Sequence, residues 1–124
     1  KILTMYEMKT AALFNFCCSS PLILSNKTSQ EIKFAEDYGT LFGLIFQIID
    51  DIIDETKNFK TLGKTPGKDK VQGKSTILSC LGEKNTIDFC KKEITKFKNK
   101  NKKYFKKYVN LEEILEFNIE KIKN

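Results

Sequence analysis

The stretch of residues 38–54 constrains this chain more than any other. Twelve uncharged residues are followed there by three aspartates, Asp50, Asp51 and Asp54. If the stretch is helical, Asp50 and Asp54 share one face, with Gln47 one turn before Asp50. Carboxylates held this close repel one another, so the arrangement is costly unless a cation lies between them.

The ligands available to such a cation are oxygen atoms. The sequence contains no histidine, and its four cysteines lie away from the aspartates. Oxygen ligands suit Mg²⁺, which binds one or two carboxylates, keeps water molecules and completes its coordination with substrate phosphates. A magnesium site at Asp50, Asp51 and Asp54 is therefore one interpretation. Solvated charges at the end of an amphipathic helix are the other.

Composition narrows the class of protein further. The 124 residues amount to one domain, and a helical apolar pattern already begins at Ile2 without an initiator methionine, so we expect a fragment of a longer chain. The net charge is +6, but all 22 basic residues are lysine, whereas surfaces that bind nucleic acid favour arginine. Charge alone therefore does not indicate a nucleic-acid partner.

The cysteines and the uncharged runs exclude two other classes. Cys17, Cys18, Cys80 and Cys90 have no C-x-x-C spacing, so we expect buried, reduced thiols rather than a zinc site. The longest uncharged run, residues 10–26, is too short and too polar for the roughly 20 apolar residues of a membrane span. Without an evident secretory signal, we expect the protein in the cytoplasm or an organelle matrix.

Apolar side chains at helical spacing predict an all-α fold, and no segment shows the sustained alternation of strands. The first predicted helix covers residues 1–24, with a break near Ser19-Ser20-Pro21 because proline disfavours helix in the residue before it. A second helix starts at the capping-box pattern of Thr28 and Glu31 and ends near Thr56.

Glycines indicate where elements pack and where they end. Gly39 and Gly43 would let another backbone approach the second helix, which indicates a helix buried in a bundle. A loop rich in glycine and lysine follows over residues 57–73. We then expect a short helix over 76–81 ended by Gly82. A helix capped by Asn85 follows, with apolar positions from Phe89 to Tyr108, and a final helix covers 111–122.

Nine lysines between residues 91 and 107 are the obvious candidate for a nucleic-acid patch. They fall mostly opposite the aromatic residues of the same helix, and Glu93 interrupts them. We therefore favour a solvated helix face. A nucleic-acid binder would instead show steep, salt-dependent binding to any duplex.

The loop of residues 67–75 is suited to an anion although it is not a P-loop. Five residues separate its glycines instead of four, and no predicted strand precedes it. Backbone N–H groups at a helix start, together with Gly73 and Lys74, could still bind anionic oxygens. The alternative is an ordinary surface loop.

Four blocks of the chain, taken in order, resemble the C-terminal half of a trans-isoprenyl diphosphate synthase, the farnesyl and geranylgeranyl diphosphate synthase family. They are Lys9-Thr10-Ala11-Ala12-Leu13, Phe46-Gln47-x-x-Asp50-Asp51-x-x-Asp54, Leu62-Gly63-Lys64-Thr65-Pro66-Gly67-Lys68-Asp69 and Gly73-Lys74-Ser75-Thr76. Beyond residue 85 the likeness is only to a helical tail. The resemblance implies that residues 1–124 are the C-terminal part of a helical bundle enclosing a deep cavity.

The resemblance also implies a reaction and a role for each site residue. The family condenses isopentenyl diphosphate with an allylic diphosphate, and two aspartate-rich motifs hold Mg²⁺ against the allylic diphosphate. The implied roles are as follows: Asp50, with Asp51 and Asp54, binds metal; Lys9, Lys64 and Lys74 contact the allylic diphosphate; Thr10 and Gln47 turn oxygen dipoles toward the carbocation; and Phe46 lines the cavity near isopentenyl diphosphate. A homodimer is implied as well.

The family's first aspartate-rich motif belongs to its N-terminal half, so the resemblance implies that this chain alone is inactive. Three alternatives stay open. One is a related cyclase, which would need Ser or Thr in place of Asp54. A non-catalytic helical subunit or a degenerate paralogue is a second alternative, against which the intact Lys9, Gln47 and Asp50 argue. The nucleic-acid binder is the third.

Overall fold

The computed structural model describes residues 10–62 and 80–121, leaving out the side chains of residues 56–62. The described ranges are helical and contain no strand, which confirms the all-α prediction for this part of the chain. Their elements are α2 (Ala12–Leu24), α3 (Ser29–Leu62), α6 (Glu83–Lys100), α7 (Lys102–Lys107) and α8 (Asn110–Glu120).

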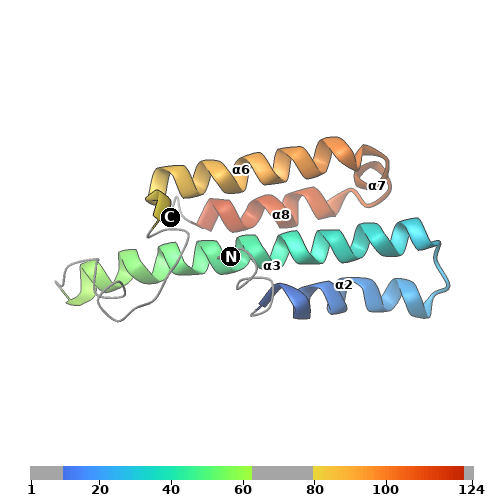
Figure 1. Ribbon diagram of the computed structural model, residues 1–124, viewed down its shortest axis with the longest axis horizontal. Coiled ribbons are helices and arrows are strands. Elements are labelled where there is room, and N and C mark those ends of the chain that lie inside the picture. The colour runs from blue at the N-terminus through green and yellow to red at the C-terminus, as the bar shows by residue number, and fades with distance from the viewer. Residues whose placement is uncertain (1–9, 63–79, 122–124) are drawn as a thin grey trace.

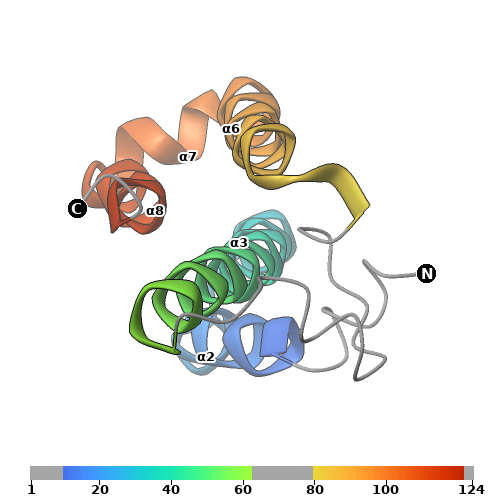
Figure 2. The same ribbon diagram turned by 90° about the vertical axis from the view of Figure 1, so that its left-hand side faces the viewer.

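Helix α3 is the central element of the bundle. Its 34 residues make a rod about 50 Å long at 1.5 Å per residue. Helix α2 packs along one side of α3, whereas α6 and α8 lie next to each other on the other side (Figures 1 and 2). The short α7 forms the corner between α6 and α8. Every other layer of the bundle is therefore positioned by its contact with α3.

Two glycines bring α2 against the backbone of α3. A Cβ atom at Gly39 would lie 2.5 Å from the carbonyl oxygen of Phe14, and one at Gly43 would lie 2.6 Å from the Cα of Ala11. The amide of Asn15 adds two hydrogen bonds across this contact, to the carbonyl oxygen of Glu36 (3.1 Å) and to Thr40 Oγ1 (2.9 Å). The close approach predicted from the glycine spacing is confirmed.

The opposite side of α3 forms the hydrophobic core with α6, α7 and α8. The isoleucines of α3 in this core are almost completely buried, and so are the residues of the other helices that pack against them. The core includes Ile45, Ile48, Ile49, Ile52, Cys90, Ile94, Phe105, Leu115 and Ile119. Burial of such side chains contributes roughly 1.5–3 kcal/mol each relative to exposure. The spacing of these isoleucines on α3 is what turns its acidic residues toward another face.

The predicted break near Ser19-Ser20-Pro21 is wrong, because α2 continues through Pro21 to Leu24. Proline removes one N–H donor, so only the bond to the Cys17 carbonyl is lost, and the helix ends within one turn. The Ser20 hydroxyl donates to the Phe16 carbonyl oxygen at 2.5 Å. The last turn of α2 thus forms although Pro21 supplies no N–H donor, so one lost hydrogen bond does not end the helix.

The predicted limits of α3 are right at its start and wrong at its end. The Thr28 hydroxyl accepts a hydrogen bond from the Glu31 backbone N–H at 3.2 Å, so this half of the predicted capping box forms. The helix then continues six residues past the predicted end near Thr56, to Leu62. No glycine or proline occurs between Thr56 and Gly63, so nothing in the local sequence stops it.

The predicted helices after Gly82 also needed correction. Helix α6 begins at Glu83 instead of being capped by Asn85, because Gly82, at φ 82°, turns the chain three residues before Asn85. The Asn85 amide donates instead to the Leu81 carbonyl oxygen at 3.1 Å. The predicted helix through Tyr108 is divided at Asn101 into α6 and α7.

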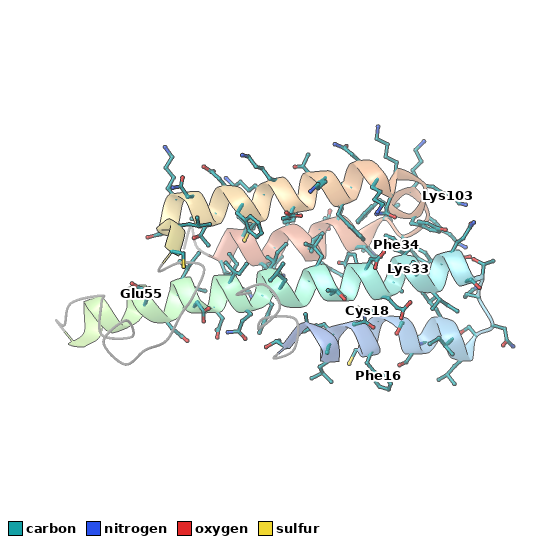
Figure 3. The ribbon with its side chains drawn as sticks, in the orientation of Figure 1. Phe16, Cys18, Lys33, Phe34, Glu55 and Lys103 are labelled. Atoms are coloured by element: carbon teal, nitrogen blue, oxygen red, sulfur yellow. The ribbon has the colours of Figure 1, made fainter. Side chains whose placement is uncertain are left out.

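The division at Asn101 folds aromatic residues back onto α3. The Phe34 ring lies 4.7 Å from Tyr104, 5.6 Å from Phe105 and 5.7 Å from Phe97, measured between ring centroids. Figure 3 shows Phe34 at the end of the bundle where Lys103 lies. A straight helix would carry Tyr104 and Phe105 away from Phe34, so the break is what completes the core at this end.

The cysteines differ from prediction in their burial, whereas the last helix has nearly the predicted bounds. All four cysteines are free, but only Cys90 is buried, and burial raises the pKa of its thiol to about 12. The prediction of buried thiols is therefore wrong for Cys17 and Cys80, which are exposed, and Cys18 is half-buried. The final helix, α8, matches its prediction within two residues at each end.

Glu31 joins the first turn of α3 to the corner around α7. The residue is buried, at 8% exposed, and its carboxylate accepts hydrogen bonds from Tyr108 Oη at 2.6 Å and from Lys107 Nζ at 2.9 Å. These two hydrogen bonds, that of Tyr108 first, hold the pKa of Glu31 below its ordinary value. The second half of the predicted capping box is thus replaced by contacts with α7.

Two properties of the outer surface stand out. None of the helices in the described ranges has the length and apolar character needed to cross a bilayer. Helix α2, however, exposes large apolar side chains on the side away from α3, including Phe16, which points outward in Figure 3. They are Leu13 (65% exposed), Phe16 (67%), Ile23 (53%) and Leu24 (83%).

Replacing Gly39 with alanine should lower the free energy of unfolding by about 1–3 kcal/mol, because the new methyl group would overlap the Phe14 carbonyl. Alanine alone favours a helix interior over glycine by roughly 0.5–1 kcal/mol, so the sign of the effect distinguishes the two contributions. Urea denaturation measures it. Asn99→Ala, at an exposed position of α6, is the control and should stay within about 0.5 kcal/mol of wild type.

Glu31→Gln should make the free energy of unfolding less dependent on pH between pH 3 and pH 7. A carboxylate whose folded-state pKa is depressed stabilises the fold above its unfolded-state pKa, and this contribution is lost as pH falls through the folded-state value. Wild type should therefore be more stable than Glu31→Gln at pH 7, and the difference should shrink below about pH 4. Denaturation at pH 7, 5 and 3 measures it. A constant difference across this range would contradict the assignment.

Candidate functional site

The three aspartates lie on α3 beside the face that enters the core. Asp50 and Asp54 are exposed and Asp51 is half-buried, whereas the intervening Ile49 and Ile52 are buried. The expected placement of Asp50 and Asp54 on one face of a helix is therefore what the structure has. The aspartates are presented to the surface by the same helix that supplies most of the core.

The electrostatic environment of Asp50 is unfavourable for its charge. Partial burial raises the pKa of Asp50, and the negative charges of Asp54 and Asp51 raise it further, while Lys121 lowers it. The carboxylates thus repel one another at short range, as expected from the sequence. A cation placed beside Asp50 would relieve this repulsion.

A chain of hydrogen bonds links the start of α2 to the aspartates. Thr10 Oγ1 donates to Gln47 Oε1 at 2.8 Å, and Gln47 Nε2 donates to Asp51 Oδ1 at 3.2 Å. Thr10 and Gln47 are 37 positions apart in sequence. The structure therefore brings together residues of two separate blocks singled out from the sequence, and it orients the Gln47 amide with its oxygen toward Thr10.

Phe46 lies beside this chain in a small aromatic cluster. Its ring is half-buried and lies 5.4 Å from the Phe14 ring and 6.5 Å from Phe42, measured between centroids. The ammonium of Lys121, at the end of α8, lies 5.3 Å from the centroid of Phe46. The acidic face of α3 is thus bordered by α2 on one side and by the end of α8 on the other.

Several residues singled out from the sequence lie outside the described ranges. Lys9, Lys64 and Lys74 are among them, as is the whole loop of residues 67–75. Within residues 10–62 and 80–121, no group of three or more histidine, cysteine, aspartate or glutamate side chains is arranged to hold a metal ion. The oxygen donors of Asp50 and Asp54 nevertheless suit Mg²⁺, which needs only one or two carboxylates when phosphate oxygens and water complete its shell.

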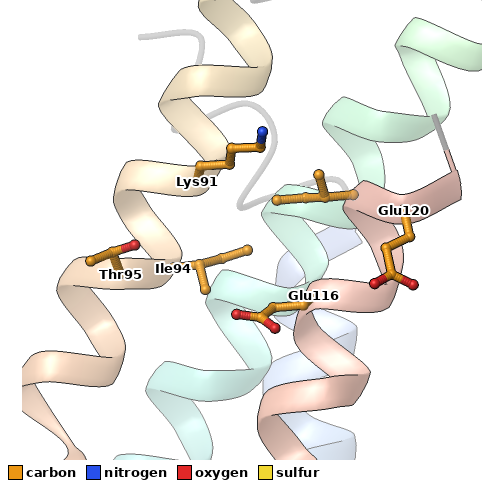
Figure 4. Close-up of a pocket in the computed structure, with 6 residues that line it drawn as sticks. Lys91, Ile94, Thr95, Glu116 and Glu120 are labelled. Atoms are coloured by element: carbon orange, nitrogen blue, oxygen red, sulfur yellow. The ribbon is translucent and has the colours of Figure 1, made fainter. Parts of the chain in front are cut away.

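The lysine-rich face and a groove lie on α6, away from the aspartates in sequence. Eight of the nine lysines between residues 91 and 107 are exposed, and the half-buried Lys98 pairs with Glu112 (2.5 Å) and Glu116 (3.1 Å) of α8. A groove of about 300 Å³ between α6 and α8 is lined by Lys91, Ile94, Thr95, Glu116, Ile119 and Glu120 (Figure 4). Its lining carries both signs of charge, which does not favour a polyanion.

A family model described as polyprenyl synthetase matches residues 1–115. The chain belongs to this family. The resemblance inferred from the four sequence blocks is thereby confirmed at the level of the family.

Several curated members of the polyprenyl synthetase family are similar to the chain. Geranylgeranyl pyrophosphate synthase 6, mitochondrial, of Arabidopsis thaliana is 36% identical over 88 residues, which cover 71% of this chain and 26% of the relative. Geranylgeranyl diphosphate synthase of Sulfolobus acidocaldarius is 36% identical over 91 residues, 73% of this chain and 26% of the relative. Heterodimeric geranylgeranyl pyrophosphate synthase large subunit 2 of Arabidopsis thaliana is 37% identical over 84 residues, 68% and 22%.

The matches cover most of this chain but only part of each relative. The chain spans about a quarter of the length of the curated polyprenyl synthetase relatives that it matches. No significant match to a solved structure was found. The family is therefore shown, while the activity of the whole protein is a matter for proposal.

Lys121 is a residue near the site that the sequence did not reveal. Phe117 and Asn118 precede it by four and three positions on α8, a spacing that places its side chain beside theirs. This local pattern was visible in the sequence. That the end of α8 reaches Phe46 depends on the packing of α8 against α3, which no local pattern predicts.

A double-mutant cycle between Thr10→Val and Gln47→Leu should give a coupling energy of about 0.5–1.5 kcal/mol, because each change removes the same 2.8 Å hydrogen bond. The free energy of unfolding from urea denaturation supplies the four corners of the cycle. Combining Thr10→Val with Thr95→Val, at an exposed position of α6, is the matched control and should be additive. Additivity in both cycles would mean that the Thr10–Gln47 contact contributes nothing.

Proposed function

We propose that the protein containing this chain is a trans-prenyltransferase of the geranylgeranyl or farnesyl diphosphate synthase type. It would condense isopentenyl diphosphate with an allylic diphosphate in isoprenoid biosynthesis. The hydrogen-bond chain from Thr10 through Gln47 to Asp51 carries this proposal, since it joins two motif blocks of the family in one place. The relatives are named geranylgeranyl pyrophosphate or diphosphate synthases, and these names support the substrate class.

The aspartates would hold the metal in this proposal. Asp50 would be the principal ligand, with Asp51 and Asp54 beside it, and the exposure of Asp50 and Asp54 supports this role. Mg²⁺ bound there would neutralise the charge that develops on the diphosphate leaving group. Asp51, which accepts a hydrogen bond from Gln47, would also keep the Gln47 amide in one orientation.

The polar residues next to the aspartates would stabilise the allylic cation. Gln47 Oε1 and the Thr10 hydroxyl are neighbouring oxygen atoms, and fixed dipoles need no reorganisation when positive charge develops. Phe46 would line the cavity near isopentenyl diphosphate. Lys9, Lys64 and Lys74 would contact the allylic diphosphate, a role proposed from their places in the family motifs.

The whole protein would contain more than this chain supplies. We propose that residues 1–124 correspond to the C-terminal half of a polyprenyl synthetase domain, with the first aspartate-rich motif elsewhere in the protein. We also propose a homodimer, which the exposed apolar side chains of α2 support because such a face is stabilised by burial against protein. The cytoplasm or an organelle matrix is the compartment that we propose.

Asp50→Ala in the full-length protein should lower Mg²⁺-dependent turnover by about 10²-fold or more, because a charge-stabilising group is removed from the leaving-group side. Release of pyrophosphate from each of a panel of allylic diphosphates, in the presence of isopentenyl diphosphate, measures it. Asp37→Ala is the matched control on the same helix, because Asp37 pairs with surface Lys33 at 3.0 Å and lies 13 residues before Asp50. Its turnover should be close to wild type.

Two outcomes would contradict the proposal in different ways. Undiminished turnover in Asp50→Ala would remove the assigned metal role. Wild-type protein that binds Mg²⁺ with pyrophosphate but forms no product would favour the alternative, a non-catalytic subunit or degenerate paralogue. A relative named as the large subunit of a heterodimeric synthase shows why a subunit role is worth testing separately.

A further inference from the structure

Lys121 occupies a defined place between α8 and α3. Its ammonium lies 5.3 Å from the centroid of the Phe46 ring on α3 and 5.6 Å from that of Phe117 on α8. Its Nζ also lies 3.4 Å from Asn118 Oδ1. Each ring attracts the ammonium, so these contacts favour this position of an exposed lysine side chain.

The position next to Phe46 brings Lys121 to the acidic cluster. Phe46 and Asp50 are four residues apart on α3 and therefore share a face. The positive charge of Lys121 opposes the increase in the pKa of Asp50 that partial burial and Asp54 cause, so the two side chains interact electrostatically. Lys121 thus stands where a counter-charge to the carboxylates is required.

Asn118 adds a second polar group at the same end of α8. It is 2% exposed, and within the described part of the chain its Nδ2 has no hydrogen-bond partner. A buried amide nitrogen without an acceptor is costly, roughly as costly as a lost hydrogen bond. Asn118 Nδ2 is buried, whereas the Lys121 ammonium is exposed, so Lys121 is the group at this end of α8 that can attract acceptor oxygen atoms from outside.

We propose that Lys121 is the resident counter-ion of the acidic cluster, and that it makes the binding of a divalent metal ion and of a diphosphate depend on each other. The inference rests on the proposed function, because it takes Asp50 as a metal ligand. It concerns what the chain's own lysine does before and after the ligands arrive.

The positive charge of Lys121 acts in opposite directions on the two ligands. Without ligands, Lys121 offsets part of the repulsion among the aspartates and so weakens binding of a bare divalent cation, which it repels. When a diphosphate accompanies the metal, its oxygen atoms attract the same ammonium, and the opposing effect becomes a favourable one. Metal and diphosphate then increase each other's affinity, and the coupling is reciprocal.

The decisive experiment compares Lys121→Met with wild type in the full-length protein. Methionine keeps much of the side-chain length and removes the charge. Binding of Mn²⁺ alone, measured from its electron paramagnetic resonance signal, should become about two- to fivefold tighter, the range expected for one exposed charge pair. Binding of inorganic pyrophosphate in the presence of Mn²⁺, measured by calorimetry, should become weaker by a similar factor.

Two matched variants separate charge from packing. Lys103→Met removes a lysine that also lies over a ring, 5.2 Å from the centroid of Tyr104, at the opposite end of the bundle from Glu55 (Figure 3). It should change neither affinity. Lys121→Arg keeps the positive charge and can still stack on the rings, so it should keep the Mn²⁺ affinity of wild type and bind pyrophosphate at least as tightly as wild type.

The direction of the two effects decides the outcome. Opposite changes for Mn²⁺ and for pyrophosphate support the proposal. Unchanged affinities, or changes in the same direction, in a variant whose wild type binds both ligands would overturn it and leave the proposed function intact. Wild-type protein that binds neither Mn²⁺ nor pyrophosphate with Mn²⁺ would instead overturn the proposed function, and this inference with it.

Discussion

The contact of α2 with α3 at two glycines is the interaction on which the candidate site depends. Gly43 lets the Ala11 backbone reach α3, and this places Thr10 within hydrogen-bond distance of Gln47 one turn further along. A side chain at Gly39 or Gly43 would push the two helices apart and break the hydrogen bond between Thr10 and Gln47. Asn15 fixes the register by bonding to both Glu36 and Thr40. The site is thus set by backbone packing before any charged residue contributes.

The other border of the site is made by α8, through contacts at both of its ends. Near its start, Tyr38 Oη donates to the Leu111 carbonyl oxygen at 2.7 Å, and near its end Lys121 lies on the Phe46 ring. Leu115 is fully buried between these points. Because both contacts are with α3, α8 lies along the central helix and its last residues reach the region of Asp50. The acidic face therefore has one polar border, from Thr10, and one cationic border, from Lys121.

The features that were predictable from sequence are those that depend on local pattern. Glycines spaced four apart, the Thr28 cap and the shared face of Asp50 and Asp54 all follow from helix geometry. The chain differs from prediction at Pro21 and Asn101 for opposite reasons: the loss of one hydrogen bond at Pro21 does not end α2, and ring contacts with Phe34 accompany a helix break that has no glycine or proline. The place of Lys121 depends on two helices meeting far apart in the chain. Such outcomes depend on tertiary contacts, which periodicity does not describe.

The continuity of α3 has a mechanical consequence. After Gly43 the helix contains neither glycine nor proline up to Leu62, so this segment has no hinge of its own. Its first turn is tied to the α7 corner through Glu31, and its aspartates lie in the same turns as the buried Ile49 and Ile52 of the core. The carboxylates therefore cannot shift without the buried isoleucines of the same turns, so a ligand bound there would meet a rigid acidic face.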